Sequence, residues 1–530
     1  MRLQPQPTER KINKAKKKKM TTPQLSYEDF IVARSRTNPC ISGLARYIKQ
    51  PPFASASRLV VVDYPANDNK LPTPQEITAV ELSKLLACPN LSTAGPRPQT
   101  RVVLVENIQP QTLIILGQIL EVDPVFFAGH VNTDFQDIEK VPLPPSLAFF
   151  PSQLAEKGFL YVHYQQVIDL GNSSTFDALP YALKTDSSPP RNVRRLPPLS
   201  GKQLALARGC CSILSRRISD GSWICLILVD PPINSVIATV NAGNITKHTS
   251  KPLHGGFEDF VQPAPFSSFE PATGNIDRNL QDPPHQRSML GSLVHYFVNH
   301  RRLQGFSANA MPSNVLTMGY YPIRIALAEW VLYTHLASRY VKFYEYTLRD
   351  VHIRLHDSDI VDLQRWRRRC KQSQHRLALL VEFVHHWRPH KHQKQRLGDD
   401  NDIDKQQQLW DLVLKDIGFL QSQLRDHSHS LEQMIPVATA MIQLLDSRQS
   451  IAQSANVTRL TYIALVFVPL SWVAGLFSMS ERYSPGGNGE FWVYWATALP
   501  LLLVVLLLSA FSRMQRPLES LNNLWERFER

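Results

Sequence analysis

The sequence predicts an α+β protein. A cytoplasmic α/β sheet domain with long helices is joined through a stalk helix to a hairpin of two transmembrane helices. Strand and helix patterns alternate from about Tyr27 to Pro232, long helical patterns follow Gly291, and two segments near the carboxyl end are apolar and uncharged. The expected parts are a basic tail (1–26), an α/β domain (27–248), a loop or linker (249–290), a long-helix stalk region (291–456), the transmembrane hairpin (457–512) and a cytoplasmic tail (513–530).

The transmembrane hairpin is predicted from Leu460–Phe477 and Phe491–Phe511, which contain no Asp, Glu, Lys, Arg or His. At about 1.5 Å per residue, each crosses or nearly crosses a hydrocarbon core of roughly 30 Å. A pair of buried helices in a soluble protein is the alternative, but two such segments so close together are rare in soluble cores. Aromatic residues gather at the expected membrane boundary: Tyr483, Phe491, Trp492, Tyr494 and Trp495.

Charge predicts the orientation of the hairpin. Basic residues flank it on its outer sides, whereas the connecting segment Ser478–Glu490 has one arginine against two glutamates. Basic flanks stay in the cytoplasm, so both termini are expected there. The plasma membrane is favoured over an organelle, because the basic tract at the amino end lacks the character of a transit peptide. The outer flanks are Arg448, Arg459, Arg513 and Arg516; the tract is Arg10, Lys11, Lys14 and Lys16–Lys19.

One face of the first span carries only small or hydroxylated residues, at alternating steps of three and four. A heptad spacing keeps such a face directed at a common axis in a bundle. In a membrane this face either lets helices pack closely or lines a narrow pore. On spacing alone, close packing is the commoner outcome. We call this set the stripe: Ser454, Val457, Thr461, Ala464, Val468, Ser471, Gly475 and Ser478.

The segment Met441–Ser480 resembles the stalk and first transmembrane helix of CorA-type magnesium transporters. Pro469 in mid-span, the run Ala474–Phe477 and Met479 fit the family pattern. Arg101–Val131 is similar to a strand-then-helix segment of fungal CorA-like proteins. The resemblance implies a homopentamer whose first span lines the pore, with membrane lipid, other copies of the chain and divalent cations as partners.

One departure from the family lies at the expected pore mouth. Where the family has Gly-Met-Asn, this chain has Ser478, Met479 and Ser480. The resemblance implies that the asparagine of the family holds hydrated Mg²⁺ through the water shell of the ion. Such an outer-sphere contact suits an ion that loses water reluctantly. Ser480 offers a shorter oxygen for the same outer-sphere contact. Weaker or altered ion selection is therefore expected, and loss of transport stays open. Glu481 and Glu490 complete the expected mouth.

The α/β domain is predicted from short aliphatic runs and one turn. Leu59–Val62 and Val102–Val105 suit strands, and Gln111–Leu120 suits a helix beginning at Pro110. Two further strands flank Asp220-Gly221, a strong hairpin signal. Phosphate-binding glycine loops, recognisable Ser/His/Asp arrangements and metal-ligand cysteine spacings are missing from this sequence. A structural or regulatory role is expected, and not catalysis. The six cysteines (Cys40, Cys88, Cys210, Cys211, Cys225 and Cys370) are expected to be reduced thiols.

Three polar clusters in the helical region suit solvated helix surfaces better than ligand sites. Arg365–Arg369 fits a solvated face or one near anionic lipid better than nucleic acid, so no nucleic-acid partner is expected. The histidines fit a solvated helix end better than zinc ligands. The aspartates fit a helix amino-terminus better than a calcium loop, because Lys405 replaces the turn glycine. The histidine cluster consists of His385, His386, His390 and His392, and the aspartate cluster consists of Asp399, Asp400, Asp402 and Asp404.

The sequence thus predicts a passive Mg²⁺ channel with no catalytic residues and no resident cofactor, the divalent cation being the transported ion. The stripe would line the pore, with Ser478, Met479, Ser480, Glu481 and Glu490 at its mouth. Two alternatives stay open: a zinc transporter of the same superfamily, and a membrane-anchored regulatory or scaffold protein that has lost conduction.

Overall fold

The computed structural model forms two compact units. The first comprises Met1–Tyr346 with Asp362–Glu432, and the second comprises Thr347–Val361 with Gln433–Arg530. The residues that the structure describes are 26–51, 56–65, 72–87, 98–131, 150–176, 180–217, 222–240, 244–253, 288–299, 315–349, 357–387, 400–479, 492–507 and 509.

The first unit is built on one sheet of eleven strands, in the order β10-β9-β5-β6-β7-β8-β3-β1-β2, with β4 pairing β7 and β11. Described neighbours run antiparallel except β3 and β8, which are parallel. The strands are β1 Arg58–Pro65, β2 Thr73–Ile77, β3 Pro98–Glu106, β4 Phe159–Asn172, β5 Ala182–Thr185, β6 Asn192–Arg195, β7 Lys202–Arg217, β8 Trp223–Val229, β9 Ser235–Val240, β10 Asn244–Thr249 and β11 Lys251–Leu253.

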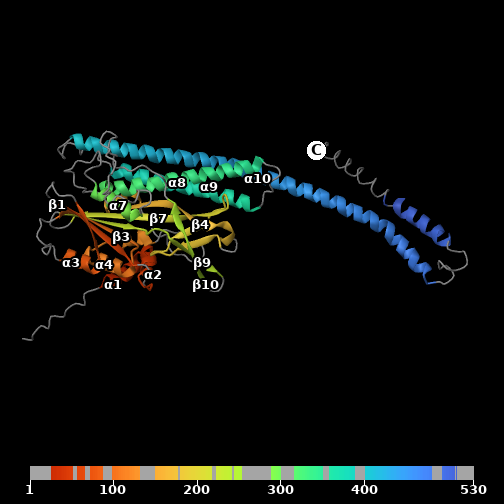
Figure 1. The fold of residues 1–530 in the computed structure, drawn as a ribbon, viewed down its shortest axis with the longest axis horizontal. Coiled ribbons are helices and arrows are strands. Elements are labelled where there is room, and N and C mark those ends of the chain that lie inside the picture. The colour runs from red at the N-terminus through yellow and green to blue at the C-terminus, as the bar shows by residue number, and fades with distance from the viewer. Residues whose placement is uncertain are drawn as a thin grey trace, which may run out of the picture. The chain divides into compact units, whose positions relative to one another are not determined.

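Helices cover both faces of this sheet (Figure 1). Short helices from the amino-terminal half lie on one face: α1 Tyr27–Thr37, α2 Ser42–Tyr47, α3 Ala79–Ala87, α4 Pro110–Ile119, α5 Pro124–Val131 and α6 Pro151–Glu156. The other face is covered by one short helix, α7 Met289–Val298, and by the long helices α8 Val315–Arg349, α9 Asp357–Trp387 and the part of α10 (Asp400–Phe477) that ends at Glu432.

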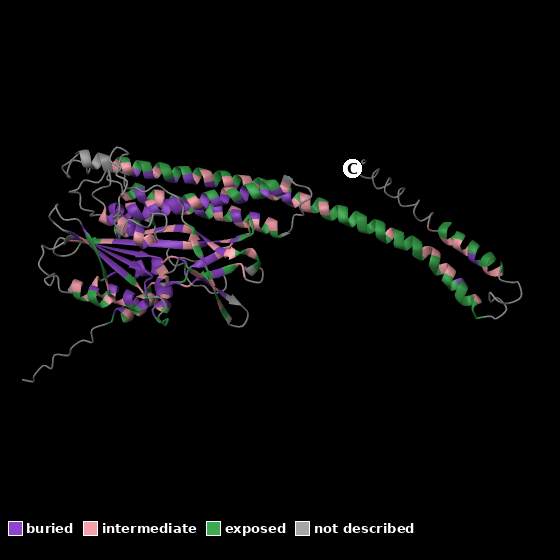
Figure 2. Cartoon of the chain, viewed as in Figure 1, coloured by how far each residue is buried: buried purple, intermediate pink, exposed green. Residues whose placement is uncertain are grey.

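The sheet is buried between these layers (Figure 2). On one face, Val61 and Val103 of the central strands pack in a cluster with Phe126 and Phe127 of α5, all at most 1% exposed. On the other face, the Trp330 indole of α8 donates a hydrogen bond to the backbone oxygen of His163 in β4, at 3.2 Å. The predicted aliphatic runs are apolar at every position because the strands that they form are covered on both faces of the sheet.

The structure confirms most predicted elements. β1 and β3 contain the two aliphatic runs, and α4 begins at Pro110, whose missing N–H costs nothing in a first turn. β7 and β8 pair across the predicted turn. α8 begins at Val315, before the predicted start at Ile323, because Pro322 is accommodated inside the helix. β11 lies within the predicted loop and pairs with β4.

The long helices pack through aromatic residues and ion pairs. Trp366 of α9 and Trp410 of α10 are at most 2% exposed. Lys371 of α9 contacts Glu432 of α10, with Nζ 2.6 Å from Oε1. α10 buries Trp410, Val413, Ile417, Leu420, Leu424 and Leu431, the spacing of an amphipathic helix.

Several predicted features lie outside the described residues: the basic tail, Cys88, His390, His392, Asp399, Ser480, Glu481, Glu490 and residues 513–530. Of Asp400, Asp402 and Asp404, only the backbone is described. The described cysteines are free thiols.

Candidate pore-lining face of α10

α10 continues without interruption from the first unit to Phe477, as predicted for a stalk that enters a membrane span. Within the described residues, the segment Gln407–Phe477 alone is long and apolar enough to cross a membrane. Only 6% of its most apolar stretch is buried, whereas the core helix of a soluble protein would be mostly covered. The second apolar helix, Trp492–Leu507, is shorter, so the two-span hairpin stays a prediction.

The end of α10 packs against this second helix through one face. Phe477 and Tyr494 meet edge to face with ring centroids 6.0 Å apart. Val473 and Ala498 are 3% and 1% exposed, while most of their neighbours are exposed. The contact face of α10 is therefore centred near Val473.

The stripe lies on the opposite side of α10. At about 100° per residue, Ser471 and Gly475 project roughly 160° from Val473. All eight stripe residues are exposed in the single chain, including Val457 and Val468 at 62% and 63%. A Cβ added at Gly475 would meet nothing within 4 Å. The face with the smallest side chains is thus among the surfaces of α10 that the second helix leaves uncovered.

Hydroxyl groups on the stripe point their protons into their own helix. Thr461 donates to the Val457 carbonyl at 2.8 Å, and Ser471 donates to the Val468 carbonyl at 2.9 Å. Ser478 donates to the carbonyl of Gly475, also at 2.9 Å. A hydroxyl that donates its proton keeps its oxygen lone pairs available. The stripe therefore presents acceptor oxygens, which suit the water hydrogens around a hydrated cation.

α10 ends where the predicted pore mouth begins. The Ser478 amide donates to the Ala474 carbonyl at 2.9 Å, and the Met479 amide donates to the Leu476 carbonyl at 3.4 Å. Met479 is 87% exposed at this last turn. Ser478 and Met479 are therefore brought to the tip of the stripe. Ser480, Glu481 and Glu490 are not among the residues that the structure describes.

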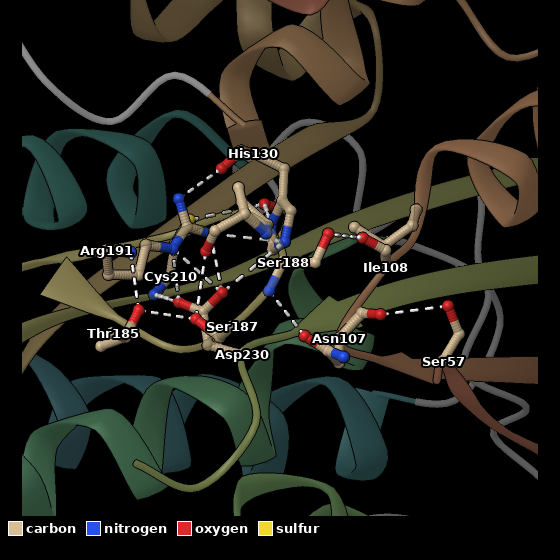
Figure 3. Close-up of polar contacts among 12 residues, drawn as sticks. Ser57, Asn107, Ile108, His130, Thr185, Ser187, Ser188, Arg191, Cys210 and Asp230 are labelled. Atoms are coloured by element: carbon tan, nitrogen blue, oxygen red, sulfur yellow. Dashed lines mark hydrogen bonds and ion pairs between the residues drawn. The ribbon is translucent and has the colours of Figure 1, made fainter. Parts of the chain in front are cut away.

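The structure also contains a buried polar network that sequence reasoning missed (Figure 3). Arg191 is 2% exposed, and its Nη2 lies 2.7 Å from Oδ1 of Asp230. Its Nη1 donates to the backbone oxygen of His130 at 2.7 Å. Asp230 Oδ2 also accepts from the Cys210 amide at 2.8 Å. These contacts tie β6–β8 to α5 and compensate two charges that would otherwise be costly to bury.

Three members of this region, Ser212, His130 and Asp230, have the side chains of a catalytic triad but not its working geometry. His130 Nδ1 lies 2.9 Å from Ser212 Oγ, whereas Nε2 lies 3.8 Å from Asp230, beyond hydrogen-bond distance. Burial, reinforced by the charge of Arg191, lowers the pKa of His130 well below its ordinary value. Ser212 and His130 are both 0% exposed. A substrate could not reach this serine, so the network has a structural role.

Metal-ligand clusters are not found among the described residues. His385 and His386 lie in the last turn of α9, the position predicted for a helix end.

The family comparison matches the carboxy-terminal part of the chain. The family model of the CorA-like Mg²⁺ transporter protein matches residues 368–513. A similar structure is the complete CorA magnesium transporter from Methanocaldococcus jannaschii, with 9% identity, a TM-score of 0.33, and coverage of 85% of this chain and 96% of that chain. The full-length CmaX protein has 11% identity, a TM-score of 0.31 and the same two coverages. No curated protein matches the sequence. Residues 368–513, which include the stripe, thus form a CorA-like domain.

Proposed function

We propose that this chain is a divalent-cation channel that conducts Mg²⁺ passively through a homo-oligomeric pore. The observation that carries the proposal is the position of the stripe. It lies within the segment that matches the CorA-like family, and the second helix leaves it uncovered. A face of small and hydroxylated residues on an apolar helix is poorly suited to lipid, since it buries little apolar surface and presents acceptor oxygens.

The pore would be enclosed by several copies of α10. One helix cannot surround an ion, but a heptad spacing keeps the stripe directed at the common axis of a left-handed bundle. The resemblance to CorA proteins implies five copies. The mass of the detergent-solubilised protein tests this point, because a monomer could not form the pore.

Conduction would need no covalent chemistry. Mg²⁺ holds its water strongly, so the ion would move hydrated past the acceptor oxygens of Thr461 and Ser471. At the mouth, Ser480 would contact the water shell of the ion. Glu481 and Glu490, repeated around the ring, would concentrate cations by their field.

The pore assignment is tested by cysteine accessibility. Ser471→Cys would place a thiol on the stripe, and Leu465→Cys would place one off the stripe, at a partly buried position. A positively charged thiol reagent should block Mg²⁺ current through Ser471→Cys and leave Leu465→Cys unchanged. The native described cysteines other than Cys40 are buried, so background modification should be small. Equal block in both variants would contradict the assignment.

A second candidate function is a membrane-anchored regulatory protein without conduction. The specific observation in its favour is the triplet Ser478, Met479 and Ser480, which replaces the amide at the mouth with a short hydroxyl. The same change makes zinc a conceivable transported ion. Replacing Ser480 by asparagine separates the candidates.

A further inference from the structure

The basic run Arg365–Arg369 does not form one continuous charged strip. Trp366 is 1% exposed and packs on Tyr340 with ring centroids 4.8 Å apart. Arg367 forms an ion pair with Glu432, with Nε 3.3 Å from Oε1. Arg368 is exposed. Arg365 and Arg369 instead share the side of α9 that meets the sheet near Tyr181.

Tyr181 is the centre of a cluster of guanidinium groups. Arg365 lies over its ring, with Cζ 4.0 Å from the centroid. Arg369 and Arg194 approach the same ring, each with Cζ 5.9 Å from the centroid. Arg369 also donates a hydrogen bond to the Tyr181 hydroxyl and stacks on Trp366 at 5.0 Å. The rings of Tyr181 and Trp366 therefore hold these guanidinium groups close together.

The charges in this cluster are not balanced. Asp362 forms an ion pair with Arg365 at 2.8 Å. In the part of the chain that the structure describes, no carboxylate pairs with Arg194 or Arg369. Among the described residues, these three guanidinium groups thus share one paired carboxylate, Asp362. The Arg365 side chain is 40% exposed, so the cluster is open to solvent.

We propose that this cluster, Tyr181 with Arg194, Arg365 and Arg369, binds a compact anion that carries several phosphoryl groups. A guanidinium that stacks through its face keeps its N–H donors at its edge, where they match phosphate oxygens bidentately. Convergence on one ring concentrates the charge at a point, which fits a triphosphate or a phosphorylated inositol. An extended nucleic acid would need a line of cations and free aromatic faces, and Arg365 already covers the Tyr181 ring.

Isothermal titration calorimetry of the full-length protein in detergent tests this proposal, with metal-free inorganic triphosphate as the probe. We expect saturable binding, one anion per chain, that is measurable at about 0.15 M salt. Arg365→Gln and Arg369→Gln should each weaken binding about tenfold, since each removes a charged, preoriented donor edge. Arg365→Lys should also weaken it, because lysine keeps the charge but loses the planar fork.

Arg368→Gln is the matched control, because it removes the same charge from the same helix outside the cluster. It should change the affinity by less than about twofold if only the cluster binds. An equal loss in Arg368→Gln and Arg365→Gln would overturn the proposal and indicate attraction by net charge alone. So would absence of binding to the wild type at about 1 mM triphosphate. Should Arg365→Gln fail to fold, as judged by its thermal melt, Arg194→Gln provides the same test from β6.

Two further titrations identify the source of the phosphoryl groups. Adenosine triphosphate should bind as tightly as inorganic triphosphate if the site takes a free polyphosphate, because the covered Tyr181 ring offers no stacking to a base. Tighter binding of soluble inositol trisphosphate would assign the same cluster to a phosphorylated lipid headgroup. Either result supports the site, provided that Arg365→Gln weakens it.

Discussion

Phe477 of α10 and Tyr494 of the following apolar helix meet edge to face, with their ring planes at 85° and their centroids 6.0 Å apart. This contact fixes which side of α10 faces its neighbour within the same chain. The stripe from Ser454 to Ser478 lies on the other side and is exposed. The described part of the chain leaves the stripe uncovered, as the proposed pore shared between copies requires.

Gly475→Leu should reduce Mg²⁺ transport by at least about tenfold, because a leucine on the axis of a narrow bundle fills the space of the ion or separates the helices. The fold of one chain should be unaffected, since a Cβ at Gly475 meets nothing within 4 Å. Uptake into liposomes measures the first effect, and the thermal melt measures the second.

Two controls accompany this variant. Leu465→Ile lies off the stripe and should leave transport nearly unchanged. Gly418→Leu adds the same bulk to α10 in the first unit, where a Cβ also meets nothing within 4 Å. If Gly475→Leu and Leu465→Ile transport equally well, the stripe does not line the pore.

Asp230→Asn should destabilise the first unit by about 3–5 kcal/mol, because it leaves the buried Arg191 charge without its counterion. Urea unfolding followed by tryptophan fluorescence measures the change. Glu76→Gln breaks the exposed pair with Arg58, whose side chains are 59% and 52% exposed. Solvent screens that pair, so its loss should cost less than about 1 kcal/mol. Similar losses in the two variants would argue against the role assigned to the buried network.

Gly117→Ala should destabilise the packing of α1 on α4 by about 1–3 kcal/mol, as expected for overpacking. A Cβ at Gly117 would lie 2.0 Å from the Tyr27 ring, whose hydroxyl is fixed by a 2.6 Å hydrogen bond to the Val122 carbonyl. Gly418→Ala, at an open helical position, should instead stabilise by up to about 1 kcal/mol. Thermal melts of both variants give the two signs, and a neutral Gly117→Ala would show that α1 moves freely.

Acidification should weaken the first unit through His130. Its folded-state pKa lies well below its ordinary value, whereas the unfolded residue titrates at about 6.5. The unfolded state therefore binds the extra proton, so stability present above about pH 6.5 is lost as the pH falls below it, by up to about 1.4 kcal/mol per pH unit.

His130→Gln removes this titration. The difference in free energy of unfolding between wild type and His130→Gln should be constant above neutral pH and should shrink on acidification. Curves that run parallel from pH 8 to about pH 5 would show that His130 is not held neutral by the fold.

Local patterns predicted much of the fold. The aliphatic runs gave β1 and β3, Pro110 gave the start of α4, and the continuity of α10 into its apolar end followed from spacing alone. These features depend on neighbours within a few residues, which periodicity and turn chemistry report. β11 was missed because a strand of three residues among turn-forming residues has no period to detect.

The buried network and the arginine cluster could not be predicted in this way. His130, Arg191 and Asp230 come from separate elements, and only the order of strands in the sheet brings them together. Tyr181 is likewise distant in sequence from Arg365. For Asp230 the sequence did contain one signal, an acidic residue directly after the buried run of β8. Long-range pairing leaves no local trace in one sequence.

Divalent uptake by the purified protein in liposomes tests the central proposal most directly. A fluorescent Mg²⁺ indicator would be enclosed, an inward-negative potential applied, and Ser480→Asn measured in parallel. We predict uptake by the wild type, with Ser480→Asn equal or faster because the amide reaches further into the mouth. Absence of Mg²⁺ uptake in both proteins would contradict the channel and leave the apolar helices as a membrane anchor. Uptake only by Ser480→Asn would contradict conduction by the natural chain and favour the regulatory role.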